Sequence, residues 1–213
     1  MKIIANKVLN ELKETPVTLV AATKYFTPDK MRELYHQGVK HFGENRVSAL
    51  LAKQEALADL DITWHFIGTL QTKKIKKMIN QIDYLHSIHK LKTAKEVNKR
   101  RKTPLNCFLQ VNISDEENKH GFSKDAVVDA VKAIEPLPNV NLIGLMGMAS
   151  HTDDESVINQ QFQILNDLQD TIKETLNISL DRLSIGMSND YKIALRHNSS
   201  FIRLGSVLFK EEV

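Results

Sequence analysis

Short apolar runs alternate with amphipathic runs along almost the whole chain. The apolar runs are rich in β-branched residues, as in VTLVAA, whereas the runs between them repeat apolar residues every three to four positions. These two periods are typical of buried strands and of helices that cover a sheet. The runs that predict strands cover residues 17–22, 39–43, 62–68, 82–88, 104–113, 140–148, 181–186 and 200–209.

A predicted helix separates each predicted strand from the next, and residues 1–14 predict an extra N-terminal helix. The helix after the first strand has typical boundary residues: Thr27 can cap it, Pro28 occupies its first position and Gly38 follows its end. Strands that alternate with helices indicate βαβ units and a parallel sheet. Eight such units predict an α/β fold of the (β/α)₈ TIM barrel type. An open doubly wound sheet is the alternative, but it normally has a glycine-rich turn after its first strand, and VAATKYFTP has none.

Length and composition favour one domain over residues 1–213. The chain is 42% hydrophobic and 26% charged, and a chain of this length buries roughly 70% of its unfolded surface without a disulfide or metal. Cys107 lies in the apolar run LNCFLQVNI. A single cysteine inside such a run predicts a small buried hydrophobe, and it favours a reducing compartment.

The sequence also narrows the compartment and the partners. The N-terminal segment MKIIANKVLNELKE is too charged for a signal peptide, and no apolar run approaches the ~20 residues of a membrane span. We therefore expect a cytoplasmic protein. Basic clusters at residues 73–77 and 99–102 fall on predicted helices, but aromatic residues are only 6% of the chain. This combination predicts solvated helix faces and no nucleic-acid partner. The histidines are scattered, and they predict no metal site.

The candidate chemistry lies at the carboxyl ends of the predicted strands, where (β/α)₈ barrels carry their active sites. Lys24 closes the first strand, an unusual place for a charge. If its amine is partly buried, it can lose its proton and form a Schiff base with a carbonyl compound. Alternatively, Lys24 extends its charged end to solvent or makes a structural ion pair with a carboxylate such as Glu44. Its position alone leaves both interpretations open.

The C-terminal third of the chain predicts a phosphate site. The segment GMSND places Met187 and Ser188 in a turn between a strand and a helix, where backbone N–H groups can bind an anion. Arg203 and Gly205 follow at the last strand, one bringing a fixed positive charge and the other allowing close approach of backbone. For Ser188 alone, capping a helix that begins at Asn189 is an equally good explanation, and such a cap is compatible with phosphate binding.

Several longer motifs resemble one known family. These are AATKYFTP, HFGENRV, WHFIGTLQTKK, HSIHK, QVNISDEENKHG, GLMGMA, LSIGMSND and FIRLGSVLF. They occur between residues 17 and 209 in the same order as in the YggS/PROSC family of pyridoxal-phosphate-binding proteins, also called pyridoxal phosphate homeostasis proteins. The chain is identified as a member of that family on these motifs.

The resemblance implies a single-domain barrel like the N-terminal domain of alanine racemase, a fold-type III protein. It implies that pyridoxal 5′-phosphate is held as an internal aldimine on Lys24. By the same resemblance, Ser188 and Gly205 bind the phosphate beside Met187, and Arg203 faces the pyridine nitrogen. The remaining residues that the resemblance places near the cofactor are Asn45, His65 and Met146. Lys119 and Gly121 correspond to residues that shape the mouth of the pocket.

The resemblance also implies a function without catalysis, namely pyridoxal phosphate homeostasis. Arg203 beside the pyridine nitrogen would disfavour its protonation and weaken the ring as an electron sink, which suits storage or transfer. The alternative is a weak amino-acid racemase or another Schiff-base barrel enzyme. Racemases of this type take a second acid/base, a tyrosine, from a C-terminal domain; here only Tyr25 is obviously near Lys24. Expected partners are related B6 vitamers and pyridoxal-phosphate-dependent apoenzymes, and we expect a monomer without membrane contact.

Two positions depart from the family pattern. Asn198 stands where the family usually has a glycine, and Lys210 replaces a glycine at the end of the last strand. Asparagine tolerates a left-handed backbone better than most residues, so we expect the turn at Asn198 to persist. We expect Lys210 to affect only the C-terminal tail.

Overall fold

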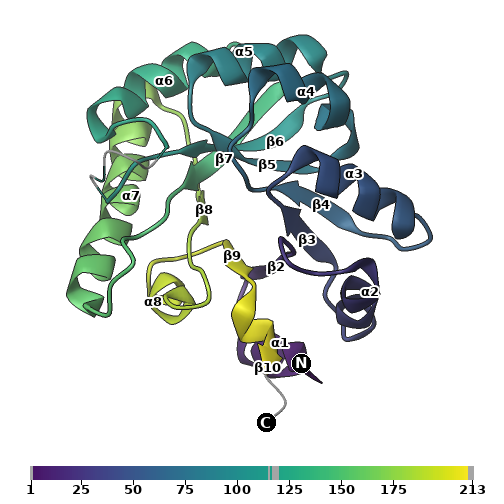
Figure 1. Cartoon of the computed structure of the whole chain (residues 1–213). Coiled ribbons are helices and arrows are strands. Elements are labelled where there is room, and N and C mark those ends of the chain that lie inside the picture. The colour runs from purple at the N-terminus through teal and green to yellow at the C-terminus, as the bar shows by residue number, and fades with distance from the viewer. Residues whose placement is uncertain (1, 115, 117–119, 211–213) are drawn as a thin grey trace.

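A closed barrel of parallel strands forms the centre of the molecule. The computed structural model describes residues 2–114, 116 and 120–210. Within them, eight parallel strands pair in chain order, and β2 closes the barrel against β9 (Figure 1). The (β/α)₈ prediction is confirmed, and the open sheet is excluded. The barrel strands are β2 (Thr18–Ala22), β3 (His41–Glu44), β4 (Thr63–Phe66), β5 (Tyr84–Ile88), β6 (Leu105–Gln110), β7 (Val140–Met146), β8 (Arg182–Ser184) and β9 (Phe201–Leu204).

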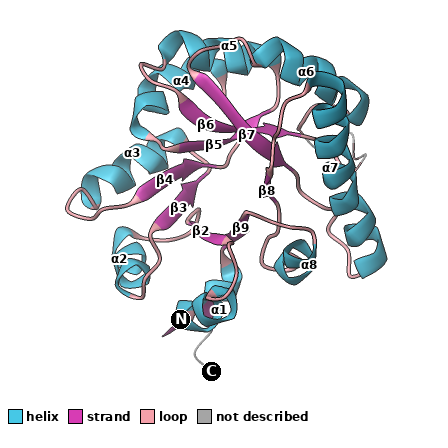
Figure 2. Ribbon diagram, turned by 180° about the vertical axis from the view of Figure 1, so that it is seen from behind, coloured by secondary structure: helices cyan, strands magenta, loops and turns pink. Residues whose placement is uncertain are grey.

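Helices surround the barrel in the order in which they occur in the chain, as both ribbon views show (Figures 1 and 2). They cover the outer face of the strands, as the alternating pattern predicts. The α-helices are α1 (Ala5–Leu12), α2 (Pro28–His36), α3 (Val47–Ala56), α4 (Thr72–Met78), α5 (Leu91–Arg100), α6 (Val127–Ile134), α7 (Glu155–Leu176) and α8 (Tyr191–Arg196). Short 3₁₀ helices occur at η1 (Ile79–Gln81), η2 (Lys124–Ala126) and η3 (Ser206–Leu208). Among the described residues, no helix has the length and apolar character needed to cross a bilayer.

The boundary residues of α2 behave as predicted. Thr27 caps the helix, because its Oγ1 accepts a hydrogen bond from the Lys30 N–H at 3.4 Å, and Pro28 occupies the first position. Gly38 has a φ of 101°, which favours glycine just after a helix end. Asn198 has a φ of 57°, so the left-handed turn expected at this departure from the family pattern is present.

The two ends of the described chain differ from the prediction. Residues 1–14 do not form one helix, because β1 (Lys2–Ile3) precedes α1 and pairs antiparallel with β10 (Phe209–Lys210). The strand predicted over 200–209 is interrupted by η3 for a related reason: the buried Leu208 accepts a hydrogen bond from the Ile4 N–H at 2.9 Å. Lys210 therefore lies in a strand rather than in a simple tail.

The apolar core has two parts. The larger part lies between the barrel and the helices and includes Cys107, which is fully buried as predicted; burial raises the pKa of its thiol. The smaller part fills the barrel interior with Val20, Phe108, Met146 and Phe201. Polar side chains share that interior. Those that are almost fully buried there are His65, His86, Ser184 and Arg203.

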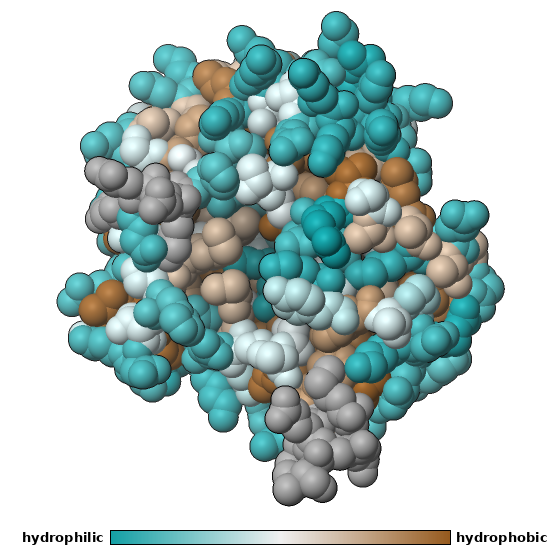
Figure 3. Space-filling view, viewed as in Figure 1, coloured by the Kyte–Doolittle hydropathy of each residue, from teal (hydrophilic) through white to brown (hydrophobic). Residues whose placement is uncertain are grey.

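The basic clusters lie on the outside, on α4 and at the end of α5. On the face shown in Figure 3, hydrophilic side chains gather over the part of the molecule where Figure 1 places these two helices. Arg101 differs from its neighbours because its guanidinium donates to the carbonyl oxygens of Ile79 and Ile82 at 2.5 and 3.1 Å. The arrangement agrees with solvated helix faces.

Candidate functional site

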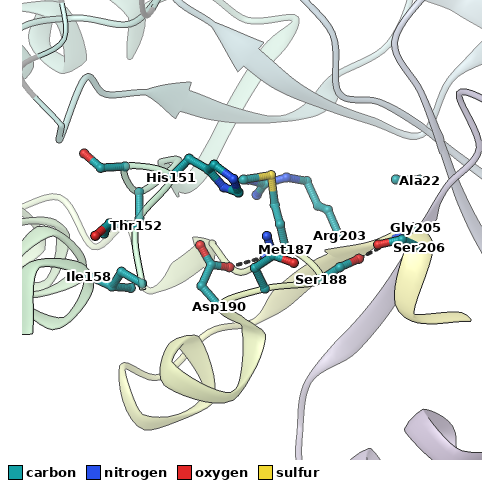
Figure 4. A pocket seen from close by; sticks show the side chains of 13 residues that line it. Ala22, His151, Thr152, Ile158, Met187, Ser188, Asp190, Arg203, Gly205 and Ser206 are labelled. Atoms are coloured by element: carbon teal, nitrogen blue, oxygen red, sulfur yellow. Dashed lines mark hydrogen bonds between the residues drawn. The ribbon is translucent and has the colours of Figure 1, made fainter. Parts of the chain in front are cut away.

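A cavity of about 300 Å³ opens at the carboxyl ends of β2, β7, β8 and β9 (Figure 4). This is the end of the barrel at which the sequence places the candidate chemistry. Four of the predicted site residues line the cavity together: Met187, Ser188, Arg203 and Gly205. The turn after β8 and the end of β9 supply them, and Ala22 at the end of β2 completes that side.

Ser188 is held by backbone N–H groups rather than capping a helix. Its Oγ accepts hydrogen bonds from the Gly205 N–H at 3.2 Å and the Val207 N–H at 3.4 Å. Helix α8 begins only at Tyr191, and Asp190 Oδ1 accepts the Met187 N–H at 2.5 Å in front of it. The capping alternative is therefore wrong. Two backbone donors converge on one hydroxyl oxygen, and such a group of N–H and O–H donors suits an anionic oxygen.

Arg203 enters the site from β9 and is only 5% exposed. Its Nη1 donates to the carbonyl oxygen and the Oγ of Ser184, both at 2.6 Å, and its Nη2 donates to the Gly147 carbonyl oxygen at 3.1 Å. Burial lowers the pKa of its guanidinium to about 10, and the charge of Asp190 opposes that change. Arg203 thus remains cationic at neutral pH, in an orientation fixed by three hydrogen bonds.

Lys24 lies in the turn after β2, two residues beyond Ala22 of the cavity wall. Its side chain is exposed, and its Nζ lies 4.8 Å from the centroid of the Tyr25 ring. The partial burial expected from the sequence is therefore not observed. The alternative ion pair between Lys24 and Glu44 is also wrong, because the carboxylate of Glu44 pairs with Lys53 instead.

The Glu44–Lys53 pair is buried directly beneath this turn. Glu44 is fully buried and Lys53 is 8% exposed. Lys53 Nζ also donates to the Thr23 carbonyl oxygen at 2.5 Å, while Glu44 Oε1 accepts the N–H groups of Asn45 and Arg46 at 2.8 and 3.2 Å. The pair thus ties the turn that bears Lys24 to the segment after β3. Sequence reasoning missed it.

A signal for the pair was present in the sequence. Val47 and Leu50 lie on the buried face of α3, and Lys53 follows three residues later on that face. A lysine that continues an apolar stripe needs a buried acceptor. Glu44 at the end of the preceding strand is the nearest candidate in the chain.

Asn45 lies at the end of β3, but it is not among the residues that line the cavity. Its backbone packs against Gly68, where an added Cβ would lie 2.2 Å from the Asn45 carbonyl oxygen. Its Oδ1 is buried, and no described group donates a hydrogen bond to it. Such an atom suits a donor from a ligand or a water molecule, so the role of Asn45 remains a prediction.

His65 and Met146 lie inside the barrel and not on the cavity wall. His65 is fully buried and hydrogen-bonds to His41 and His86, while Met146 packs with Phe108 and the rest of the inner apolar cluster. The contact of these two side chains with a cofactor therefore stays a prediction. Gly121 packs against the backbone of Val111 and Asn112; Lys119 lies outside the described residues.

Comparison with known proteins identifies relatives along nearly the whole chain. Residues 19–213 match the family described as alanine racemase, N-terminal domain. The chain is 35% identical over 201 residues to the pyridoxal phosphate homeostasis protein of Aquifex aeolicus, covering 93% of this chain and 88% of that protein. It is 37% identical over 216 residues to the protein of the same name from Schizosaccharomyces pombe, covering 98% and 90%.

Solved structures give the same assignment. PipY of Synechococcus elongatus PCC7942 without PLP superposes with a TM-score of 0.88 at 29% identity, covering 96% of this chain and 99% of PipY. A second PipY structure, with PLP bound, has a TM-score of 0.88 at 27% identity and covers 97% and 100%. Alanine racemase of Clostridium difficile 630 has a TM-score of 0.82 at 13% identity, and this chain covers 56% of it. That likeness shows the shared barrel fold. The chain thus belongs to the alanine racemase N-terminal domain family and to the family of pyridoxal phosphate homeostasis proteins.

Proposed function

We propose that this chain binds pyridoxal phosphate, attaches it covalently to Lys24 and takes part in pyridoxal phosphate homeostasis as a carrier without catalysis. The observation that carries the proposal is one cavity, at the carboxyl ends of the strands, that combines Ser188, Gly205 and Arg203 beside the turn of Lys24. The PipY structure with PLP bound, on the same fold, supports it. We further propose that residues 1–213 act as one monomeric, cytoplasmic domain.

The donors of the cavity fit the phosphate. A phosphate group prefers backbone N–H groups and hydroxyls that point at one position. The N–H groups of Gly205 and Val207 already converge on the Ser188 hydroxyl. These two N–H groups and the hydroxyl would together hold the phosphate. Gly205 leaves room there, because an added Cβ would meet nothing closer than the Ala22 carbonyl oxygen at 3.4 Å.

Arg203 fits the ring of the cofactor. We propose that its guanidinium faces the pyridine nitrogen. A cation in a fixed position disfavours protonation of that nitrogen. The three hydrogen bonds to Ser184 and Gly147 keep the guanidinium from turning toward the phosphate. Met187, which is 37% exposed, lies on the same cavity wall and can cover the ring.

Lys24 supplies the amine. Pyridoxal phosphate brings an aldehyde, which forms a carbon–nitrogen double bond with a primary amine and releases water. The turn of Lys24 is anchored by the bond from Lys53 to the Thr23 carbonyl oxygen, whereas the Lys24 side chain itself is exposed. A fixed backbone with an exposed amine favours loading and unloading of the cofactor. We propose that pyridoxal-phosphate-dependent apoenzymes are the acceptors.

The tyrosines support a function without catalysis. Tyr191 donates its hydroxyl hydrogen to Glu11 at 2.9 Å, and burial with that carboxylate raises its pKa to about 12. Tyr84 stacks on His65, with ring centroids 4.6 Å apart. Tyr25 stands next to Lys24 but is 80% exposed, and no group in the described part of the chain holds its hydroxyl for proton transfer.

A titration with pyridoxal phosphate tests the proposal. We expect the purified chain to become yellow with one equivalent, because the amine-bound cofactor absorbs visible light, and to turn L-alanine into D-alanine no faster than a blank. A chain that remains colourless would contradict the proposed binding. Racemase turnover that requires Lys24 would instead establish the enzyme alternative.

Replacing Ser188 with alanine should weaken binding of pyridoxal phosphate about 10- to 100-fold, because one hydrogen bond to a charged group is worth about 1.5–3 kcal/mol. Pyridoxal, which lacks the phosphate, should bind the variant and the unaltered chain equally. Ser48 on α3 is exposed, and Ser48→Ala is a matched control that should change neither affinity. An equal loss for both ligands in Ser188→Ala would place the phosphate elsewhere.

A further inference from the structure

Three histidines form a continuous hydrogen-bonded column through the barrel interior. His41 Nδ1 lies 2.9 Å from His65 Nε2, and His65 Nδ1 lies 2.8 Å from His86 Nε2. The column continues to the candidate site, because His86 Nδ1 lies 2.7 Å from Ser184 Oγ, which accepts the hydrogen bond from Arg203. We call His41, His65 and His86 the histidine column.

The column connects the two ends of the barrel. His41 is the first residue of β3 and is half-buried, whereas His65 and His86 are fully buried. Aromatic rings enclose the buried members: Tyr84 stacks on His65 and Phe108 on His86, each with centroids 4.6 Å apart. Solvent therefore reaches the column at His41, on the side of the barrel opposite the cavity.

The hydrogen positions along the column follow from the contact of its inner end, His86, with Ser184 and Arg203. A guanidinium only donates, so Ser184 Oγ accepts from Arg203 and gives its own hydrogen to His86 Nδ1. His86 then carries its hydrogen on Nε2 and donates to His65 Nδ1. His65 likewise donates from Nε2 to His41 Nδ1. One direction of donation thus runs from Arg203 outward to His41.

We propose that the histidine column positions Arg203 and couples it to protonation of His41 at the opposite end of the barrel. A protonated His41 carries a hydrogen on both nitrogens, so its Nδ1 must donate to His65. His65 and His86 must then both carry their hydrogen on Nδ1, and His86 donates to Ser184 Oγ. The column can hold this added proton only by reversing every hydrogen bond in it.

The reversal takes up one proton. The added proton resides on His41, the hydrogens of His65 and His86 are on Nδ1 instead of Nε2, and Ser184 keeps its own hydrogen. Ser184 Oγ then accepts from both His86 and Arg203, and its own hydrogen must turn away. Each donor takes one lone pair of Ser184 Oγ, but Ser184 no longer donates to His86. A hydroxyl that donates is a stronger acceptor, so the hydrogen bond from Arg203 weakens when that donation is lost. The consequence for the cofactor rests on the proposed function: a less firmly held Arg203 changes the charge beside the pyridine ring.

The groups around the column set the pH at which it reverses. Burial lowers the pKa of His41, and the nearby carboxylate of Asp83 opposes that shift. Burial, and after it the charges of His65 and Arg203, lowers the pKa of His86. Burial and the neighbouring His41 likewise lower the pKa of His65, which stacks on Tyr84. On the other side, His41 pairs in register with the apolar Val20 of β2. We therefore expect reversal on the acid side of the usual histidine value of about 6.5.

Long-range proton–nitrogen NMR correlations of the histidine rings test the proposal on the full chain. Above about pH 6.5, His65 and His86 should each show a single tautomer with hydrogen on Nε2. On acidification both should change to Nδ1 at the midpoint at which His41 protonates. Unchanged tautomers in His65 and His86 while His41 titrates would overturn the proposal.

Variants separate the column from general effects of pH. His41→Asn keeps an acceptor for His65 but cannot titrate, so the joint change should disappear; its persistence would contradict the coupling. His197 is half-buried and hydrogen-bonds to Asn159, outside the column, so His197→Asn is the matched control that should leave the change intact. At the higher pH, Ser184→Ala should give His86 a mixture of tautomers, because its donor is lost. A single unchanged tautomer there would overturn the assigned direction.

The cofactor gives an independent readout. With pyridoxal phosphate bound, the visible absorption should change at the same midpoint, and His41→Asn should remove that step. An absorption that stays constant while the tautomers reverse would overturn the coupling to Arg203. If the chain binds no pyridoxal phosphate, the proposed function fails, but the NMR experiment still decides whether the column reverses as one unit.

Discussion

Lys24→Ala is expected to abolish covalent attachment of pyridoxal phosphate. Borohydride treatment of the loaded chain should fix one pyridoxyl group on Lys24, and peptide mass analysis should find only background labelling in the variant. The physical reason is that Lys24 lies in the turn two residues beyond Ala22 of the cavity wall, with an exposed side chain that can reach toward a bound cofactor. The yellow colour should disappear with the label, because it requires the carbon–nitrogen double bond.

Two control variants make this result specific. Lys24→Arg keeps the positive charge but cannot form the double bond, so it should lose the label as completely as Lys24→Ala. Lys73 is exposed near the start of α4, and Lys73→Ala should keep full labelling. Reversible binding through Ser188 should survive in all three variants. A pyridoxyl group on another lysine of the unaltered chain would contradict the assignment of Lys24.

The sequence predicted the barrel because its strongest signals are local. Each strand and helix has its own period and boundary residues, such as Thr27 and Gly38, and these do not depend on distant contacts. The errors lie at the chain ends, where β1 and η3 exist only because Ile3 and Leu208 are buried against distant segments. Such pairing leaves no periodic signal in a two-residue strand.

The candidate site was predicted in part for a similar reason. Met187 and Ser188 follow β8, and Arg203 and Gly205 lie at the end of the neighbouring β9, so parallel pairing alone brings them together. The motif WHFIGTLQTKK indicated that His65 is a functional residue, but it did not show on which side of the strand the side chain points. The structure shows it inside the barrel, where alternate strand residues fill the interior.

The histidine column could not have been found from the sequence. His86 and Ser184 are 98 positions apart, and their contact depends on the way the strands stagger around the barrel. His41 looked like an ordinary strand residue, and its partner His65 was 24 positions away. No spacing rule connects them. Only the closed barrel brings the three rings and Arg203 into one series of hydrogen bonds.

The buried Glu44–Lys53 pair should have the largest effect on stability. In Lys53→Met, the carboxylate of Glu44 remains buried without its cation, and removing one member of such a pair costs about 3–5 kcal/mol in the free energy of unfolding. Urea denaturation should show this loss. Arg196→Met removes one member of an exposed pair with Glu155, whose side chains are 55% and 68% exposed, and should cost about 1 kcal/mol or less.

The double variant Lys53→Met with Glu44→Gln separates two effects of Lys53: neutralising the buried carboxylate of Glu44 and holding the turn of Lys24. It removes the unpaired buried charge, so most of the lost stability should return. The bond from Lys53 to the Thr23 carbonyl oxygen is still missing, however, and it is this bond that holds the turn of Lys24 against α3. We therefore expect slower labelling of Lys24 by pyridoxal phosphate at restored stability. If labelling recovers together with stability, the pair supports the fold alone; if stability does not recover, an unpaired charge is not what destabilises the single variant.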